Sequence, residues 1–304
     1  MRQLLLLSAV AHLAACSDST PEVSGENTRA ATDGRLVVYV VNHPLEYFAE
    51  RIGGDAVRVE FPAPQGDPAY WSPEPETVID YQAADLILLN GAGYAKWTGR
   101  ASLPPSRTVD TSVAFADRLI AVGGITHAHG PEGAHEHGDM AFTTWLDLTL
   151  AIEQARAVFG AFTSARPGEA EGFQRRFAKL EHDLRVVDES LTAAVASDPN
   201  RPLLASHPVY QYLEFRYGLN LVSVHWEPGE EPDQLQWRQL QQTLEDHPAH
   251  WMFWEATPLE ETRARLEALG VMVLVIDPGG NRASGGDFLA IMRANVDSLA
   301  RAFR

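Results

Sequence analysis

The chain has one cysteine, Cys16, and few basic residues for its 304-residue length. A single cysteine excludes an intramolecular disulfide. The chain has only 24 Lys and Arg residues but 41 Asp and Glu residues, which gives a formal net charge of −17. This deficit argues against nucleic acid as a partner, because phosphate binding needs a basic surface. The five methionines and one cysteine form no cluster in the sequence of the kind that selects Cu(I).

Common catalytic motifs are also missing from the sequence. It contains no G-x-S-x-G elbow, no P-loop and no H-E-x-x-H pair, and the segment GAGYAKW at 91–97 lacks the full G-x-G-x-x-G pattern. A metallohydrolase built from His207, Glu255 and Asp277 is the enzymatic alternative. We predict that the chain is not an enzyme.

The N-terminal apolar run, MRQLLLLSAVAHLAAC, is too short to span a bilayer as a mature helix. It resembles a bacterial lipoprotein signal, which implies that Cys16 carries a lipid anchor; a plain secretory signal is the alternative. Residues 17–34 are polar without apolar periodicity and predict a flexible tether. We therefore expect a signal peptide at 1–16 and a membrane-anchored lipoprotein in the periplasm or at the cell surface.

Strand-like apolar runs alternate with helical patterns on both sides of a long helix. This alternation predicts an α/β fold with two β/α lobes, parallel sheets and a ligand cleft between the lobes. The expected bounds are 35–165 for the first lobe, 166–198 for a rigid linking helix and 199–304 for the second lobe. A coiled-coil dimer is the alternative reading of the helix. Its apolar stripe, in steps of three and four, comprises Ala170, Phe173, Phe177, Leu180, Leu184, Val187, Leu191 and Ala194.

Histidines and carboxylates recur where the predicted strands end, which is where ligands bind in open α/β sheets. These nitrogen and oxygen donors suit transition metals. The strand-end positions are His43, the segment 67–71, His207, His225, Glu255 and Asp277. Aromatic residues near the same ends, Tyr70, Trp71 and Trp226, are expected to line the cleft.

Four histidines, His127, His129, His135 and His137, lie within eleven residues of a loop at 126–138. The glycine and proline content of the surrounding segment argues against a stable helix or strand there. Histidines in a flexible acidic loop are typical of loose metal binding, and imidazole suits Zn²⁺. We therefore expect the loop to be an auxiliary metal site.

Six segments, in order, resemble the ZnuA/TroA-like solute-binding lipoproteins of zinc and manganese ABC importers. They are HPLEYFAERIGGDAVRV, PEPETVIDYQAADLILLNGAGYAKW, WLDLTLA, SHPVYQYLEFRYGL, LEALGVMVLVIDPGG and FLAIMRANVDSLARAF. The resemblance implies two lobes, a rigid long helix and a metal held by three His (or two His and a Glu) and an Asp. It places two of these ligands on His207 and Asp277, whereas Ala69 and Thr143 occupy the positions of the other two.

Three hypotheses follow from the two missing ligands. The metal site is rebuilt with His43 and with Glu255 or His225, or the cleft binds an organic or metal-chelate ligand, or the protein is a periplasmic metal chaperone that works through its histidine loop. The histidine content favours the first, with Zn²⁺ as the transported ion and Mn²⁺ or another divalent metal as the alternative. We expect a monomer that delivers the ion to an ABC permease in the inner membrane.

Overall fold

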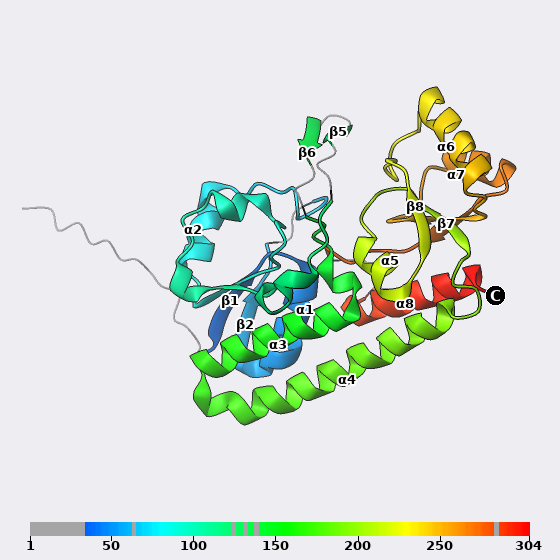
Figure 1. Ribbon diagram of the computed structural model, residues 1–304. Coiled ribbons are helices and arrows are strands. Elements are labelled where there is room, and N and C mark those ends of the chain that lie inside the picture. The colour runs from blue at the N-terminus through cyan, green and yellow to red at the C-terminus, as the bar shows by residue number, and fades with distance from the viewer. Residues whose placement is uncertain (1–33, 63–64, 123–125, 130–132, 137–139, 283–285) are drawn as a thin grey trace, which may run out of the picture. The chain divides into compact units, whose positions relative to one another are not determined.

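A computed structural model describes residues 34–304, apart from 63–64, 123–125, 130–132, 137–139 and 283–285, and Gly34–Arg304 form one compact unit (Figure 1). The predicted signal peptide, Cys16 and all of the tether except Gly34 lie outside the described residues, so these features stay predictions. Within the described part of the chain, no helix has the length and apolarity needed to cross a membrane.

The first sheet has four parallel strands in the order β2-β1-β3-β4. Its strands are β1 (Leu36–Val40), β2 (Val57–Glu60), β3 (Leu86–Leu89) and β4 (Thr108–Asp110). Helices α1 (His43–Gly53) and α2 (Pro75–Ala83) make the crossovers. Asn42 caps α1 by accepting a hydrogen bond from the Leu45 N–H, and Pro44 lies in the first turn, where its missing N–H is not needed. The three-residue strand β4 was not predicted, because it is too short to show a pattern.

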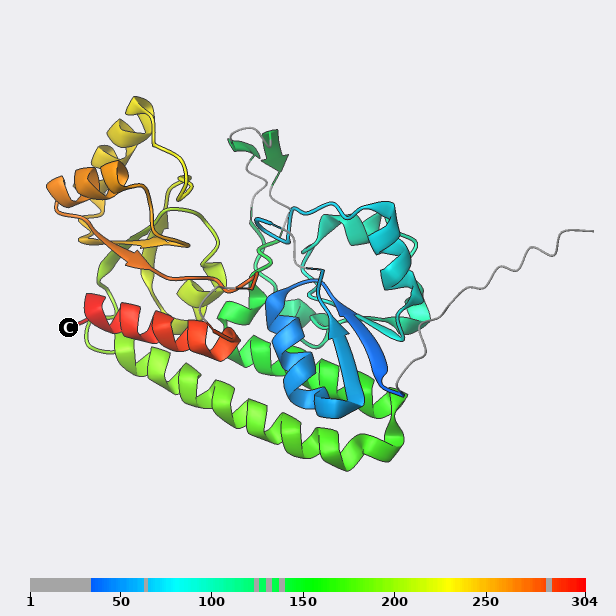
Figure 2. The same ribbon diagram turned by 180° about the vertical axis from the view of Figure 1, so that it is seen from behind.

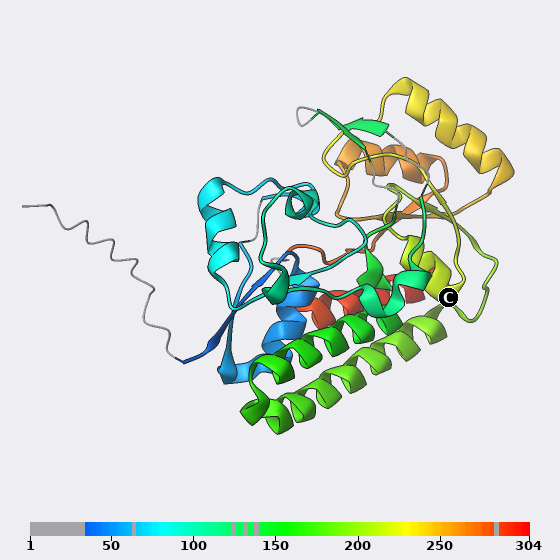
Figure 3. The same cartoon turned by 60° about the vertical axis from the view of Figure 1, so that its left-hand side comes forward.

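The second sheet repeats this arrangement in the order β10-β9-β7-β8, again with parallel strands (Figures 1 and 3). Its strands are β7 (Pro202–Ala205), β8 (Asn220–Ser223), β9 (Trp251–Trp254) and β10 (Met272–Val275). The crossover helices are α5 (Gln211–Tyr217), α6 (Gln234–Asp246) and α7 (Glu260–Ala268). Asp233 and Gln236 form a reciprocal capping box at the start of α6. The two parallel sheets confirm the predicted fold class.

Helices α3 (Leu148–Ala165), α4 (Ala170–Val195) and α8 (Phe288–Ala302) form a layer along one side of the molecule (Figures 1 and 2). At 1.5 Å per residue, the 26 residues of α4 span roughly 39 Å, enough to pass both sheets. Helix α4 packs against α1, α3 and α8. The predicted apolar stripe of α4 therefore packs against helices of the same chain, and not against a second copy of α4 in a coiled-coil dimer. Its buried members are Phe173, Phe177, Leu180, Leu184, Val187 and Leu191.

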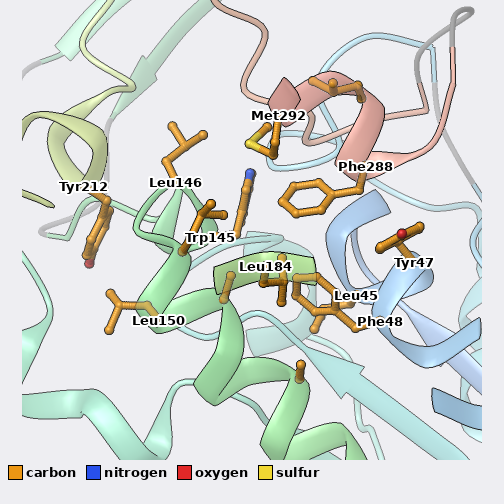
Figure 4. Close-up of a cluster of buried hydrophobic side chains, with 14 of the residues drawn as sticks. Leu45, Tyr47, Phe48, Trp145, Leu146, Leu150, Leu184, Tyr212, Phe288 and Met292 are labelled. Atoms are coloured by element: carbon orange, nitrogen blue, oxygen red, sulfur yellow. The ribbon is translucent and has the colours of Figure 1, made fainter. Parts of the chain in front are cut away.

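The helical layer joins the two lobes through an aromatic cluster (Figure 4). Phe48 from α1 and Phe288 from α8 meet edge to face, with ring centroids 5.5 Å apart. Trp145, just before α3, is almost fully buried, and its indole N–H donates to the Pro278 carbonyl of the second lobe at 2.7 Å. Burial of these rings and of Leu184 stabilises the lobes as one body.

The histidine segment contains a β-hairpin, so the expectation that it forms no strand is wrong. Strands β5 (Thr126–His129) and β6 (Gly133–Glu136) pair in antiparallel register. In the sequence, Gly130 and Pro131 lie between the two strands, so these breakers interrupt neither ladder. Short 3₁₀ turns complete the fold at Gly54–Ala56, Lys96–Gly99, Pro105–Arg107, Val113–Arg118, Thr144–Leu146 and Pro167–Glu169.

Truncation of the α4 stripe tests its role in joining the lobes. We expect Leu184→Ala to lower the free energy of unfolding by about 2–5 kcal/mol, because it opens a cavity in a fully buried position. Val186→Ala is the matched control, since Val186 lies on the same helix and is 45% exposed. Chemical denaturation measures both variants; equal effects would contradict the assignment.

Candidate functional site

Four donor side chains follow the four strands of the second sheet. Asp277 follows β10, Glu255 follows β9, His207 follows β7 and Glu227 follows β8. Because the strands are parallel and adjacent in that order, these residues lie along one edge of the sheet, with neighbouring strands about 4.8 Å apart. The topology therefore collects one imidazole and three carboxylates where ligands bind in α/β folds.

His207 is buried at the centre of this edge. Its Nδ1 lies 3.1 Å from Glu255 Oε1, and its Nε2 lies 3.7 Å from Glu227 Oε1. The ring of His225 contacts His207 edge-on, with centroids 6.3 Å apart. A carboxylate on Nδ1 fixes the orientation of the ring, as it does for metal-ligating histidines, so that Nε2 faces Glu227.

The pKa of His207 is raised despite its burial. Burial alone would lower it, but the contact with Glu255 and the negative charges of Glu255, Glu227 and Asp67 outweigh that effect. The imidazolium is thus favoured by an excess of carboxylates around it. The same carboxylates would also stabilise a metal cation bound beside His207.

Asp67 brings a further carboxylate from the loop between β2 and α2. Asp67 is an exposed residue, and the loss of hydration of its carboxylate beside the cavity is the largest of the effects that raise the pKa of Asp67 to about 6. The Ala69 N–H, which donates to Asp67 Oδ1 at 2.8 Å, and His207 oppose this rise, while Glu255 and Glu227 add to it. Asp67 therefore belongs to the same electrostatic cluster as His207.

A cavity of about 220 Å³ lies beside these groups and takes its walls from both lobes. Asp67, Glu255 and Asp277 are its acidic lining residues, and Tyr94, Phe142 and Trp145 are its aromatic ones. The remaining lining residues are Gly66, Pro68, Thr143, Val209, Pro278, Gly280 and Asn281. This confirms the predicted cleft between the lobes, and its lining is suited to a cation.

The segment 277–282 forms one wall of the cavity and is attached to the first lobe. The His43 N–H donates to the Gly280 carbonyl at 3.1 Å, and the Asn281 amide donates to the Gly66 carbonyl at 2.7 Å. Arg282 forms a bidentate ion pair with the buried carboxylate of Glu46 on α1. Movement of this wall therefore requires several polar contacts to break together.

At the corresponding strand ends of the first sheet, a network of neutral amide side chains takes the place of charged ones. Asn42 donates to Asn90 at 3.1 Å, and Gln154 on α3 donates to Asn90 and Thr111. Asn90 in turn donates to the Phe142 carbonyl at 2.9 Å. This buried network fixes the strand ends and the segment that carries Phe142 and Thr143 into the cavity wall.

The predicted metal ligands are only partly brought together. His207 and Glu255 are in contact, and Asp277 lines the cavity. Burial raises the pKa of Asp277, against the opposing hydrogen bond from the Gly279 N–H. His43 is buried at the start of α1 outside the cavity lining; burial lowers its pKa, and the nearby Asp277 opposes this. In the described part of the chain, no three His, Cys, Asp or Glu residues are grouped to hold a metal ion, so the ligand set stays a prediction.

Ala69 and Thr143, which stand where the resemblance implies two further ligands, have local structural roles. Ala69 is buried, and its backbone supports Asp67. The Thr143 hydroxyl donates to the Val209 carbonyl at 2.5 Å, across the lobes. Neither residue adds a strong metal donor at its position.

The predicted cleft aromatics lie in different surroundings. Tyr70 packs edge-on against Phe142 at 6.0 Å, near the cavity, whereas Trp71 packs against Trp97 at 6.3 Å. Trp226 is buried in the core of the second lobe, with its ring centroid 4.7 Å from that of Trp237. Their role in ligand binding stays a prediction.

The histidine hairpin is described at the level of its backbone. His127 and His135 are register partners, and His129 lies two residues from His127, so the three positions share one face of the hairpin. His137 lies outside the described residues.

Sequence reasoning missed three residues of the site: Asp67, Glu227 and Tyr94. Glu227 follows β8 by four residues, so the strand-end rule could have found it beside His225. Asp67 was noted in the segment 67–71 but was not selected, because its proximity to His207 depends on how the two lobes meet.

Comparison with known proteins decides the family. The ZnuA family model, "Zinc-uptake complex component A periplasmic", matches residues 38–302. The chain belongs to the ZnuA family. This confirms the resemblance seen in the six sequence segments, and the family consists of extracytoplasmic solute-binding components of metal importers.

Individual ZnuA-like proteins are distant in sequence but similar in fold. "Zinc-binding protein AdcA" of Streptococcus pyogenes is 22% identical over 88% of this chain, which spans only 56% of AdcA. "High-affinity zinc uptake system protein ZnuA" of Bacillus subtilis is 22% identical over 94% of this chain and 92% of its own length. The crystal structure of the "Metal-dependent Lipoprotein YcdH" from Bacillus subtilis has a TM-score of 0.77 at 20% identity, covering 88% of this chain and 99% of YcdH.

Loss of hydration, together with the nearby Glu255 and Glu227, predicts a gain in stability when Asp67 is neutralised. Because its pKa is higher in the folded than in the unfolded chain, ionisation of Asp67 costs stability above about pH 6, and this cost shrinks as the pH falls from about 6 toward the unfolded value near 3.8. We expect Asp67→Asn to stabilise the metal-free protein at pH 7.5 by about 1 kcal/mol, since solvent screening reduces the roughly 3 kcal/mol of the full pKa difference.

Thermal denaturation at pH 7.5 and 4.5 measures this effect. The gain should shrink at the lower pH, where Asp67 is protonated. Asp297→Asn on the exposed face of α8 is the control and should change little at either pH. A gain independent of pH would argue against the electrostatic cause.

Proposed function

We propose that this chain is the solute-binding protein of an ABC importer, which captures a divalent metal ion at His207, beside the cavity between the lobes, and delivers it to a membrane permease. The observation that carries the proposal is the buried imidazole of His207 among Glu227, Glu255 and Asp67. The contact with Glu255 and the surrounding negative charges raise the pKa of His207 against its burial. Loss of hydration is the main cause of the raised pKa of Asp67, and Glu255 and Glu227 add to it. A cation would relieve the repulsion among these carboxylates.

His207 Nε2 and the Glu227 carboxylate are the first donors we assign to the ion. Their separation of 3.7 Å is close to the spacing of two ligands on one metal. Glu255 orients the ring through Nδ1, and Asp67 adds negative charge. Asp277, on the wall segment, and His43, whose backbone N–H donates to Gly280 of that segment, stay in the proposed set.

Zn²⁺ is the cargo that the family and the named relatives favour. Loss of two histidine ligands at Ala69 and Thr143 leaves a donor set richer in oxygen, which suits Mn²⁺ better than a three-histidine site does. Binding of both ions, with Zn²⁺ preferred by the imidazole, is the expected outcome.

We further propose roles for the histidines of the hairpin, in weak metal binding, and for the N-terminus, in membrane anchoring. His127, His129 and His135, on one face of the hairpin, and His137 would collect ions loosely near the membrane. A lipid on Cys16 would anchor a monomer on the outer side of the membrane that holds the permease. Members of the family are transport components, so we assign no enzymatic activity.

Removal of His207 tests the cavity site. Calorimetric titration of the metal-stripped protein with Zn²⁺ should give one-to-one binding that His207→Ala abolishes. Glu255→Gln should weaken binding by roughly 10–100-fold, as the loss of an orienting partner does. His182→Ala, on the exposed face of α4, is the control and should bind normally. One-to-one binding that survives in His207→Ala would refute the assignment.

Deletion of residues 126–138 separates the hairpin from the cavity. We expect the deletion to remove weak additional Zn²⁺ equivalents and to leave the one-to-one site intact, because the cavity lining lies outside this segment. The same titration measures both classes of site. If all binding disappeared with the deletion, the chaperone hypothesis would replace the carrier proposal.

A further inference from the structure

The segment GAGYA at 91–95, which matched no nucleotide motif, has an unusual backbone. Gly91, Ala92, Gly93 and Ala95 all have positive φ values, between 53° and 77°. Among the described residues, Ala92 and Ala95 are the two non-glycine residues with positive φ. Strain of this kind persists where the surrounding structure requires it and is concentrated at functional sites. Tyr94 is the one residue of this segment after Gly91 that has a large side chain.

The strained turn places Tyr94 in the cavity wall. Its ring is held edge-on between Phe142 and Trp145, at centroid distances of 5.3 and 5.6 Å. The side chain is 5% exposed, and its hydroxyl has no hydrogen-bond partner among the described residues. Burying a hydroxyl without a partner is costly, so such a group in a cavity wall indicates a ligand.

The space beside this hydroxyl is kept open by Gly280. A Cβ at Gly280 would lie 3.7 Å from Tyr94 Oη and 3.4 Å from the Trp145 ring. At about 30 Å³ per water, the 220 Å³ cavity has the volume of roughly seven waters. A bare divalent ion fills only a small part of such a space.

The residues that line the cavity indicate which further ligand would bind the metal ion together with the protein. Ala69 supplies no donor, and the Thr143 hydroxyl is engaged with Val209. The carboxylates of Asp67, Glu255 and Asp277 disfavour an anionic co-ligand. A neutral oxygen ligand that hydrogen-bonds to a hydroxyl and to carboxylates meets these conditions, and water is the simplest.

We propose that the metal is bound with part of its hydration shell retained, and that the Tyr94 hydroxyl positions a metal-bound water at the place left by the lost histidines. The inference rests on the proposed function. Tyr94 acts through that water and is therefore a positioning residue. A site of this type also accepts ions that keep water readily, such as Mn²⁺.

Mn²⁺ binding to the full protein tests the inference, with Tyr94→Phe and the control Tyr39→Phe, a tyrosine of β1 outside the cavity lining. Water-proton relaxation counts the exchangeable waters on bound Mn²⁺. We expect at least one water on wild-type protein, and a 5- to 10-fold weaker affinity in Tyr94→Phe, as for the loss of about one hydrogen bond. Tyr39→Phe should match the wild type.

Thermal denaturation of the metal-free variants distinguishes positioning from a structural role. Because the Tyr94 hydroxyl has no partner among the described residues, Tyr94→Phe should not lower the melting temperature. A lower melting temperature with unchanged affinity would overturn the inference, as would Mn²⁺ bound without water or a failure to bind Mn²⁺. The Zn²⁺ titration of His207→Ala tests the proposed function separately, so failure of the two can be told apart.

Discussion

The candidate site depends on the common edge at which the four parallel strands of the second sheet end. Each strand is followed by a donor, in the order Asp277, Glu255, His207 and Glu227. Side chains that follow adjacent strands at this edge lie close together, because neighbouring strands are about 4.8 Å apart. The excess of carboxylates around one imidazole is therefore a consequence of topology, and the raised pKa of His207 follows from it.

The first lobe contributes structure more than charge. Its strand ends carry amides that pair with one another through Asn90 and Gln154, and these hold the cavity segment around Phe142. The exception is Asp67, which meets the charges of the second lobe across the cavity. Helix α4 and the aromatic cluster around Trp145 keep this junction in place. The second lobe thus provides most of the donor side chains, and the first lobe provides the hydrogen-bonded structure that holds the cavity wall in place.

Much of the fold was predictable because its signals are local. The α4 stripe and the β-branched runs can each be read from a short window, and the strand-end rule placed His207, Glu255 and Asp277 correctly at one edge. The hairpin around His127 was mispredicted because proline and glycine were taken to break strands that they only separate. The role of Tyr94 could not be predicted, since alanine does not favour the positive φ values that Ala92 and Ala95 adopt beside it.

By itself, the sequence determined the two β/α lobes and the long helix, because periodicity is a property of the chain alone. Only the tertiary structure decided which groups surround the cavity between the lobes. Asp67 and His207 are 140 positions apart in the sequence, and Tyr94 and Gly280 are 186 apart. Their proximity depends on how two separately built sheets are held together by the helices between them, and no local pattern encodes that distance.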